Sequence, residues 1–65
     1  MVTINGKEFS DLAGTKLLSF LESHGYDSER LVVELNRGIV PKKSYADTIL
    51  QDQDVLEILN LVGGG

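Results

Sequence analysis

The residues with the clearest chemical potential stand at the end of the printed sequence, which closes with LNLVGGG. A carboxylate on Gly65 has no neighbouring side chain, so a reagent can approach its carbonyl from either side. Gly63 and Gly64 can take up backbone angles closed to other residues and could thread a narrow channel in another protein. Holding such a segment costs chain entropy, which favours a partner that grips it along its length. The ending is therefore typical of a carrier whose terminal carboxylate is activated and passed between enzymes, although a cloning remnant or a frayed end would look the same.

The rest of the sequence offers little catalytic equipment. It contains one histidine, His24, and no cysteine, a combination that cannot make a typical zinc site. We expect His24 to be exposed near the negative end of a helix dipole. The serines show no nucleophile elbow, and the glycines before the tail form no phosphate-binding loop. A solvated acidic face, without the spacing of an EF-hand, is expected from Asp47, Asp52, Asp54 and Glu57. These residues predict a protein that is not an enzyme and binds no metal.

Composition limits the class of protein and of partner. The 65 residues, of which 42% are hydrophobic and 25% charged, predict one small folded domain. The formal net charge of −4 disfavours nucleic acid and favours a basic protein surface. No apolar run approaches the roughly 20 residues that span a bilayer, and the first residues do not resemble a signal peptide. Together with the absence of cysteine, these features lead us to expect a cytoplasmic protein without a membrane partner.

The stretch VTINGKEFS predicts a β-hairpin. Val2 and Ile4 alternate with polar residues, which gives the first strand one apolar face. Asn5-Gly6 is the strongest short signal for a type I′ turn, because that turn needs φ > 0 at both central residues. The chain is expected to return through Phe9 on the second strand.

The stretch AGTKLLSFLESHG predicts the main helix. Leu17, Phe20 and Leu21 recur at the spacing of one helical face. Thr15 is the expected N-cap, and Gly25 is the expected C′ residue that ends the helix.

The second half of the chain predicts strands. RLVVELN and VLEILNLV read as two longer strands, and Ile39-Val40 as a short extended piece preceded by a turn or bulge at Gly38. The order of hairpin, helix, strand, short strand and strand predicts an α+β fold, a mixed β-sheet with one main α-helix packed on one face. We expect the domain to occupy residues 1–62, followed by a flexible tail over residues 63–65.

Alternation divides the last strand into two faces. The face that carries Glu57 should be the outer one, since an unpaired carboxylate is expensive to bury. Leu59 and Leu61 share that face, and Val32 of the other long strand is expected to join them. Clustered apolar residues on an exposed face predict a docking surface for a partner. The alternatives are a strand buried on both faces and isolated surface leucines. Val62 stands between Leu61 and the glycines, and it could act either in docking or in the tail.

The second half also carries a pattern that resembles a known family. The stretch ELNRGIVPKKSYADTILQDQDVLEIL, followed by Gly64-Gly65, is similar to the sulfur carrier proteins of thiamine biosynthesis, within the ubiquitin-like β-grasp superfamily. The family often has Trp where Tyr45 stands, and many of its members do not need the third glycine, Gly63. The matching residues before the glycines are Asn36, Ile39, Val40, Pro41, Lys42, Tyr45, Asp52 and Asp54.

The resemblance implies a cycle carried out by partner enzymes. An ATP-dependent adenylyltransferase, similar to the ubiquitin-activating type, adenylates the Gly65 carboxylate. Sulfur from a cysteine-derived persulfide then displaces AMP and leaves a thiocarboxylate, which donates its sulfur to thiazole synthase. Gly63 and Gly64 would provide access to the reactive end, and Leu59 and Leu61 would help hold the strand against each enzyme. The domain would bind no cofactor, because ATP belongs to the activating enzyme.

Three other functions remain open from the sequence. A sulfur carrier of another pathway, such as the small subunit of molybdopterin synthase, tends to be longer and to approach its glycines through a different apolar segment. A protein modifier conjugated to lysines, as ubiquitin is, would produce a ladder of heavier bands. An interaction module would keep its function after loss of Gly64 and Gly65.

Overall fold

The computed structural model of the chain describes residues 1–61. The predictions for Val62, Gly63, Gly64 and Gly65, and the predicted boundary between residues 62 and 63, lie outside the described residues. The strands and the main helix follow the predicted order, and two short 3-10 turns lie among them. The elements are β1 (Val2–Ile4), β2 (Lys7–Phe9), α1 (Leu17–Ser23), η1 (Ser28–Arg30), β3 (Leu31–Leu35), β4 (Gly38–Ile39), η2 (Lys42–Ser44) and β5 (Val55–Asn60).

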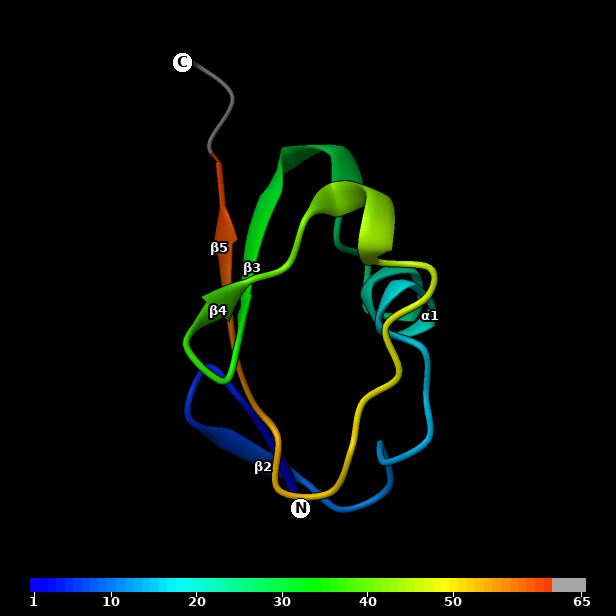
Figure 1. Cartoon of the computed structure of the whole chain (residues 1–65), viewed down its shortest axis with the longest axis vertical. Helices are drawn as coiled ribbons and strands as arrows, with labels where there is room; N and C mark the ends of the chain where they lie inside the picture. Colours follow the sequence, from blue (N-terminus) through cyan, green and yellow to red (C-terminus); the bar gives the residue numbers. More distant parts are fainter. Residues whose placement is uncertain (62–65) are drawn as a thin grey trace.

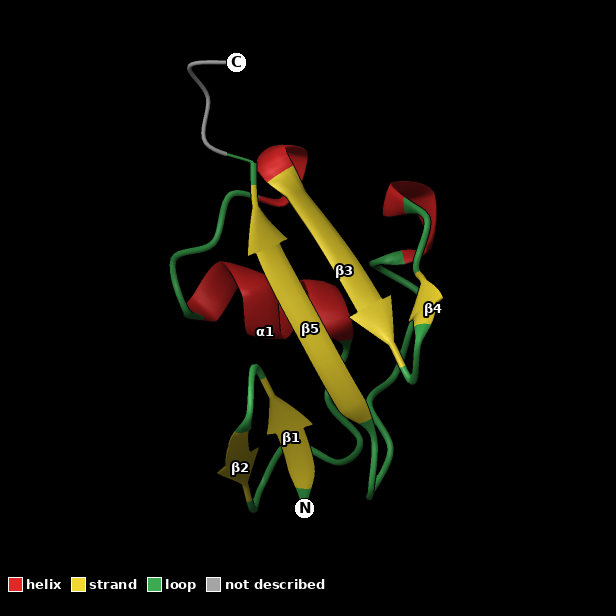
Figure 2. Ribbon diagram, turned by 90° about the vertical axis from the view of Figure 1, so that its left-hand side faces the viewer, coloured by secondary structure: helices red, strands yellow, loops and turns green. Residues whose placement is uncertain are grey.

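The strands form one mixed sheet in the order β2-β1-β5-β3-β4. β5 runs parallel to β1 and antiparallel to β3, so the last strand lies in the middle of the sheet. α1 lies against one face, and the chain between β4 and β5 runs on that same side (Figure 1). Seen from the other side, β5 and β3 lie in front of α1 and no helix covers them (Figure 2). These features confirm the predicted α+β fold with one main helix on one face.

The hydrophobic core fills the space between α1 and the sheet. The predicted helical stripe of Leu17, Phe20 and Leu21 is fully buried there. On the sheet side, Leu56 and Ile58 of β5 also point inward, as the alternation predicted. The remaining core residues are Val2, Ile4, Leu31, Val33, Val40, Tyr45 and Leu50.

The first hairpin turns at Asn5-Gly6, with φ of 50° and 83°. Ile4 pairs with Lys7 across this two-residue connection, which confirms the predicted turn. The Asn5 side chain has a second task, because its Oδ1 accepts the Ile58 N–H at 2.7 Å while its Nδ2 donates to the Ile58 carbonyl at 3.2 Å. One asparagine therefore both makes the turn and ties it to β5.

The two ends of α1 follow different rules. Gly25, with φ of 78°, follows the last helical residues and is the C′ residue, as predicted. The prediction that Thr15 is the N-cap is wrong, because α1 begins at Leu17 and its N-cap residue is Lys16, whose side chain makes no capping hydrogen bond. A β-bridge between Lys16 and Ile49 holds the preceding backbone extended. This tertiary contact, rather than a local capping signal, determines where the helix starts.

The turn between β3 and β4 lies one step earlier than predicted. Asn36 and Arg37 carry the positive φ angles, 50° and 74°, and Gly38 is already in β4 opposite Leu35. The prediction of a turn or bulge at Gly38 is therefore wrong. Asn36 stabilises the observed turn, because its Oδ1 accepts the Val55 N–H at 2.9 Å.

Asp54 also departs from the prediction. It is 8% exposed and therefore does not belong to a solvated acidic face. One carboxylate oxygen accepts the Gln51 N–H at 2.7 Å, and the other accepts Nδ2 of Asn36 at 2.9 Å. Asp54 thus joins the loop before β5 to the turn after β3, which gives it a structural role.

Candidate docking surface

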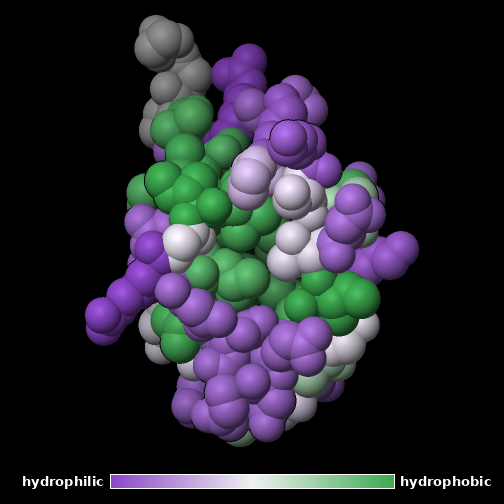
Figure 3. All heavy atoms as spheres, viewed as in Figure 1, coloured by the Kyte–Doolittle hydropathy of each residue, from purple (hydrophilic) through white to green (hydrophobic). Residues whose placement is uncertain are grey.

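The outer patch is a group of three apolar side chains on the face of the sheet opposite α1, namely Val32 of β3, Leu59 of β5 and Leu61, which follows β5. Leu59 and Leu61 are 57% and 54% exposed, and Val32 is half-buried. Val32 faces Leu59 in the antiparallel pairing of β3 with β5, as the prediction that they share a face requires. Figure 3 shows hydrophobic surface near the end of the described part of the chain. The described residues thus end in an exposed apolar surface at Leu61, which precedes Val62 and the glycines in the sequence.

The position of Leu61 is determined by the backbone of η1. Its N–H donates to the carbonyl oxygen of Arg30 at 2.8 Å. This bond continues the pairing of β5 with β3, in which Asn60 faces Leu31. The chain is therefore still held against the sheet at the last residue before Val62.

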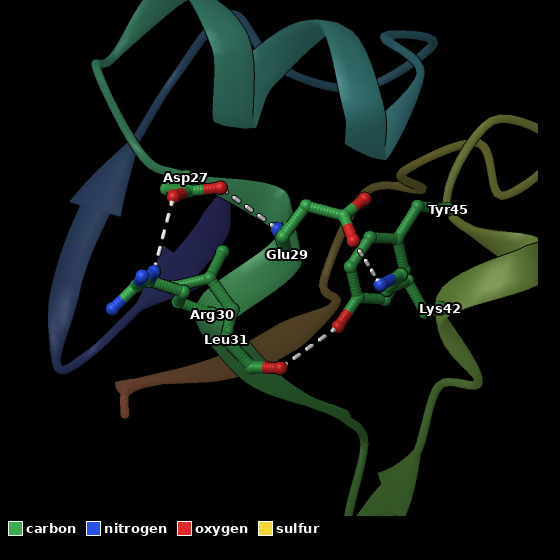
Figure 4. A network of polar contacts seen from close by, with 6 residues as sticks. All are labelled: Asp27, Glu29, Arg30, Leu31, Lys42 and Tyr45. Carbon is green, nitrogen blue, oxygen red and sulfur yellow. Dashed lines mark hydrogen bonds and ion pairs between the residues drawn. The ribbon is translucent and has the colours of Figure 1, made fainter. Parts of the chain in front are cut away.

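A polar network holds η1 in place (Figure 4). Asp27 is its N-cap, since its carboxylate accepts the Glu29 N–H at 3.0 Å, and the same carboxylate lies 3.7 Å from Nε of Arg30. Glu29 in turn forms an ion pair with Lys42 of η2. These exposed pairs contribute little stability individually, but they link the two short turns on the side of the sheet that α1 covers.

Tyr45 supports the same region from the core. Its hydroxyl donates to the Leu31 carbonyl at 3.4 Å, and the ring is almost fully buried. Burial raises the pKa of the Tyr45 phenol above its ordinary value, and the positive charge of Lys42 partly offsets that rise. The side chain is therefore kept neutral and acts as a hydrogen-bond donor to the first residue of β3.

A hollow of about 430 Å³ lies next to the outer patch on the same face of the sheet. Two of the side chains that line it are carboxylates, Glu34 of β3 and Glu57 of β5. These two residues are direct partners in the strand pairing. Val55 is 47% exposed in this hollow. The lining residues are Glu34, Asn36, Arg37, Val55 and Glu57.

The remaining polar groups form no second centre in the part of the chain that is described. The His24 ring is exposed, as predicted, and stacks on Phe20 with 4.2 Å between ring centroids. Over residues 1–61, no group of three or more His, Cys, Asp or Glu side chains could hold a metal ion. Within the same residues, no helix has the length and apolar character needed to cross a membrane.

Two features of this surface were absent from the sequence prediction. The alternation of RLVVELN places Glu34 on the face of Val32, but its position opposite Glu57 depends on strand register. The contact of Arg30 with Leu61 joins residues far apart in the sequence. Neither pairing leaves a local signal.

Three comparisons with known proteins agree on one family. The ThiS family model matches residues 2–65. The chain is 35% identical over 66 residues to the sulfur carrier protein ThiS of Bacillus subtilis, with 100% of both chains covered. It superposes with a TM-score of 0.78 on the crystal structure of the thiamine biosynthesis protein ThiS from Geobacter metallireducens, at 30% identity over 98% of this chain and 97% of that one.

A further relative is much longer. The chain is 42% identical over 64 residues to a thiazole synthase of Paramagnetospirillum magneticum. The alignment covers 98% of this chain but only 20% of that protein, so the chain spans about a fifth of the length of this relative.

Proposed function

The chain belongs to the ThiS family of sulfur carrier proteins of thiamine biosynthesis, and from that membership we propose that the carboxylate of Gly65 is the group on which it carries sulfur. The observation that supports the proposal best is the exposed outer patch, which ends at Leu61. A partner that binds this patch is held at the point where the chain leads into the glycines. The patch provides recognition, and the tail provides the reacting group.

The proposed chemistry begins with activation, because a free carboxylate has a poor leaving group. A carboxylate oxygen of Gly65 attacks the α-phosphorus of ATP, pyrophosphate leaves, and the acyl adenylate forms. The terminal sulfur of a cysteine-derived persulfide then attacks the acyl carbon and AMP leaves. Cleavage of the remaining S–S bond by a thiol releases the thiocarboxylate, whose soft sulfur is a good nucleophile towards the substrate of thiazole synthase.

The chain's own residues supply positioning rather than catalysis in this scheme. We assign Val32, Leu59 and Leu61 to contacts with each enzyme, Val62 to the junction, and Gly63 and Gly64 to access through a narrow channel. ATP is bound by the activating enzyme, and we assign the proposed cycle to the cytoplasm. The similarity of this chain to part of a thiazole synthase supports that enzyme as the acceptor of sulfur.

Intact mass spectrometry tests the proposal. The protein is incubated with the activating enzyme of the same organism, ATP and a persulfide source, and the expected change is replacement of one oxygen by one sulfur. The untreated sample shows whether Gly65 is the last residue, and Gly65→Val, which crowds the carbonyl, serves as the matched variant that gains no sulfur. A mass that never changes would refute the sulfur carrier assignment for Gly65. A ladder of heavier conjugates would instead indicate a protein modifier.

A further inference from the structure

The outer face of the sheet carries two carboxylates that oppose each other. Glu34 and Glu57 are direct partners in the pairing of β3 with β5, and both alternate with residues that point into the core. Like charges placed directly opposite across two strands destabilise a sheet. Within residues 1–61, neither Glu34 nor Glu57 takes part in an ion pair. Arg37 lines the hollow beside them but, in the described part of the chain, forms no ion pair with either glutamate, so the free protein keeps two adjacent carboxylates on this face outside any salt bridge.

This carboxylate pair is continuous with the outer patch. Glu34 lies two residues after Val32 on β3, and Glu57 lies two residues before Leu59 on β5, so all four side chains share one face. The hollow beside the pair has a volume of about 430 Å³, which is room for a side chain from another molecule. Apolar surface also borders the pair on its other side, because Ile39 faces Glu34 across the strands and is 69% exposed.

We propose that this continuous surface docks the activating enzyme, with an arginine or lysine side chain of that enzyme entering the hollow between Glu34 and Glu57 while an apolar area covers Val32 and Leu59. This inference rests on the proposed function and identifies the chemistry of the partner. Arginine suits the position best, because its planar guanidinium can bind carboxylates through two parallel hydrogen bonds.

Charge selects this occupant over a second copy of the chain. Two copies that met through this face would bring two such carboxylate pairs together in molecules that each carry a net charge of −4. A cationic side chain from a partner instead removes the repulsion between Glu34 and Glu57. The same two residues should therefore weaken the free fold and strengthen docking. A purely structural role would not separate these two effects.

The experiment measures both effects in the same variants. We use Glu57→Gln, Glu57→Lys and, as a matched control, Glu22→Gln on α1, whose side chain is exposed on the opposite side of the molecule. Stability is followed by urea unfolding. Docking is followed by the Kd for the activating enzyme from titration calorimetry and by the KM for the carrier in ATP–pyrophosphate exchange.

The expected result has opposite signs for stability and docking. Glu57→Gln should raise the unfolding midpoint but weaken docking roughly tenfold, with kcat unchanged. Glu57→Lys should stabilise the fold further, since it creates an opposite-charge pair with Glu34, and should weaken docking more than Glu57→Gln does. The Kd of the wild type should rise with salt more steeply than that of either variant. Glu22→Gln should change neither quantity.

Other results would overturn the inference in recognisable ways. An unchanged Kd in Glu57→Lys would exclude the cationic contact, and an equal loss in Glu22→Gln would show an effect of net charge alone. A wild-type dimer in sedimentation experiments that Glu57→Lys changes would assign the face to a second copy. If the wild type binds the enzyme but is never adenylated, the proposed function fails while the docking result stands. If it does not bind at all, both fail.

Discussion

The backbone N–H of Leu61 donates to the carbonyl oxygen of Arg30 at 2.8 Å, one residue beyond the end of β5. The two residues belong to segments that are far apart in the sequence, and their contact holds the chain against the sheet up to the residue before Val62. The Leu61 side chain remains 54% exposed beside this contact. The backbone is therefore fixed where the apolar side chains are exposed, which is the arrangement that the proposed docking surface requires.

Replacement of Leu59 by Ala should separate docking from folding. Leu59 is 57% exposed, so the free energy of unfolding should change by no more than about 0.5 kcal/mol. The KM for the carrier in ATP–pyrophosphate exchange should rise, because apolar contact with the enzyme is lost. The neighbouring Ile58 is 5% exposed, and Ile58→Ala should cost roughly 2–5 kcal/mol of stability. Equal KM values for wild type and Leu59→Ala would remove Leu59 from the docking surface.

Replacement of Gly65 by Val should abolish thiocarboxylate formation while leaving the fold intact. The new side chain should crowd the carbonyl of the proposed reaction, whereas the hydrophobic core of the described residues lies between α1 and the sheet. Urea unfolding of the variant should match the wild type within about 0.5 kcal/mol, as is usual for surface changes. A loss well above about 1 kcal/mol would mean that Gly65 has a structural role.

Replacement of Tyr45 by Phe should alter the response of stability to alkaline pH. Burial raises the pKa of Tyr45 in the folded state, so the neutral phenol stabilises the fold fully below the unfolded pKa, near 10, and this contribution is lost as pH rises through the folded pKa. Unfolding midpoints measured between about pH 9 and pH 11 should fall less steeply in Tyr45→Phe than in the wild type. Tyr26→Phe, which alters the other tyrosine, is the matched control. Parallel slopes for wild type and Tyr45→Phe would contradict the expected contribution.

Replacement of Asn36 should show that its side chain holds β5 in place. Asn36→Ala removes the hydrogen bonds to Asp54 and to the Val55 N–H and leaves alanine at φ of 50°. A buried carboxylate then lacks a donor, and the expected loss of stability is roughly 2–3 kcal/mol. Asn36→Gly loses the same bonds but tolerates the backbone angle, so it should be about 1 kcal/mol more stable than Asn36→Ala. Both values follow from urea unfolding, and a loss below about 0.5 kcal/mol in both variants would contradict the role of Asn36.

The sequence by itself determined the features that depend on neighbouring residues. Asn5-Gly6 predicted its turn because φ > 0 at both positions is a local requirement, and Gly25 predicted the helix end for the same reason. The two faces of β5 followed from strand alternation, with Ile58 buried and Leu59 exposed. The order of elements then predicted one helix on one face of a mixed sheet, and the resemblance carried by the second half predicted the family.

The tertiary structure alone decided the features that depend on residues distant in sequence. The bridge of Lys16 with Ile49 moves the start of the helix past Thr15. The hydrogen bond between Asn36 and Asp54 fixes the turn before Gly38, and it accompanies the burial of a carboxylate that the sequence predicted to be solvated. The meeting of Glu34 with Glu57 is of the same kind, since strand register brings the two together. Local dihedral preferences and periodicity act within a few residues, whereas these contacts exist only after the chain has folded back on itself.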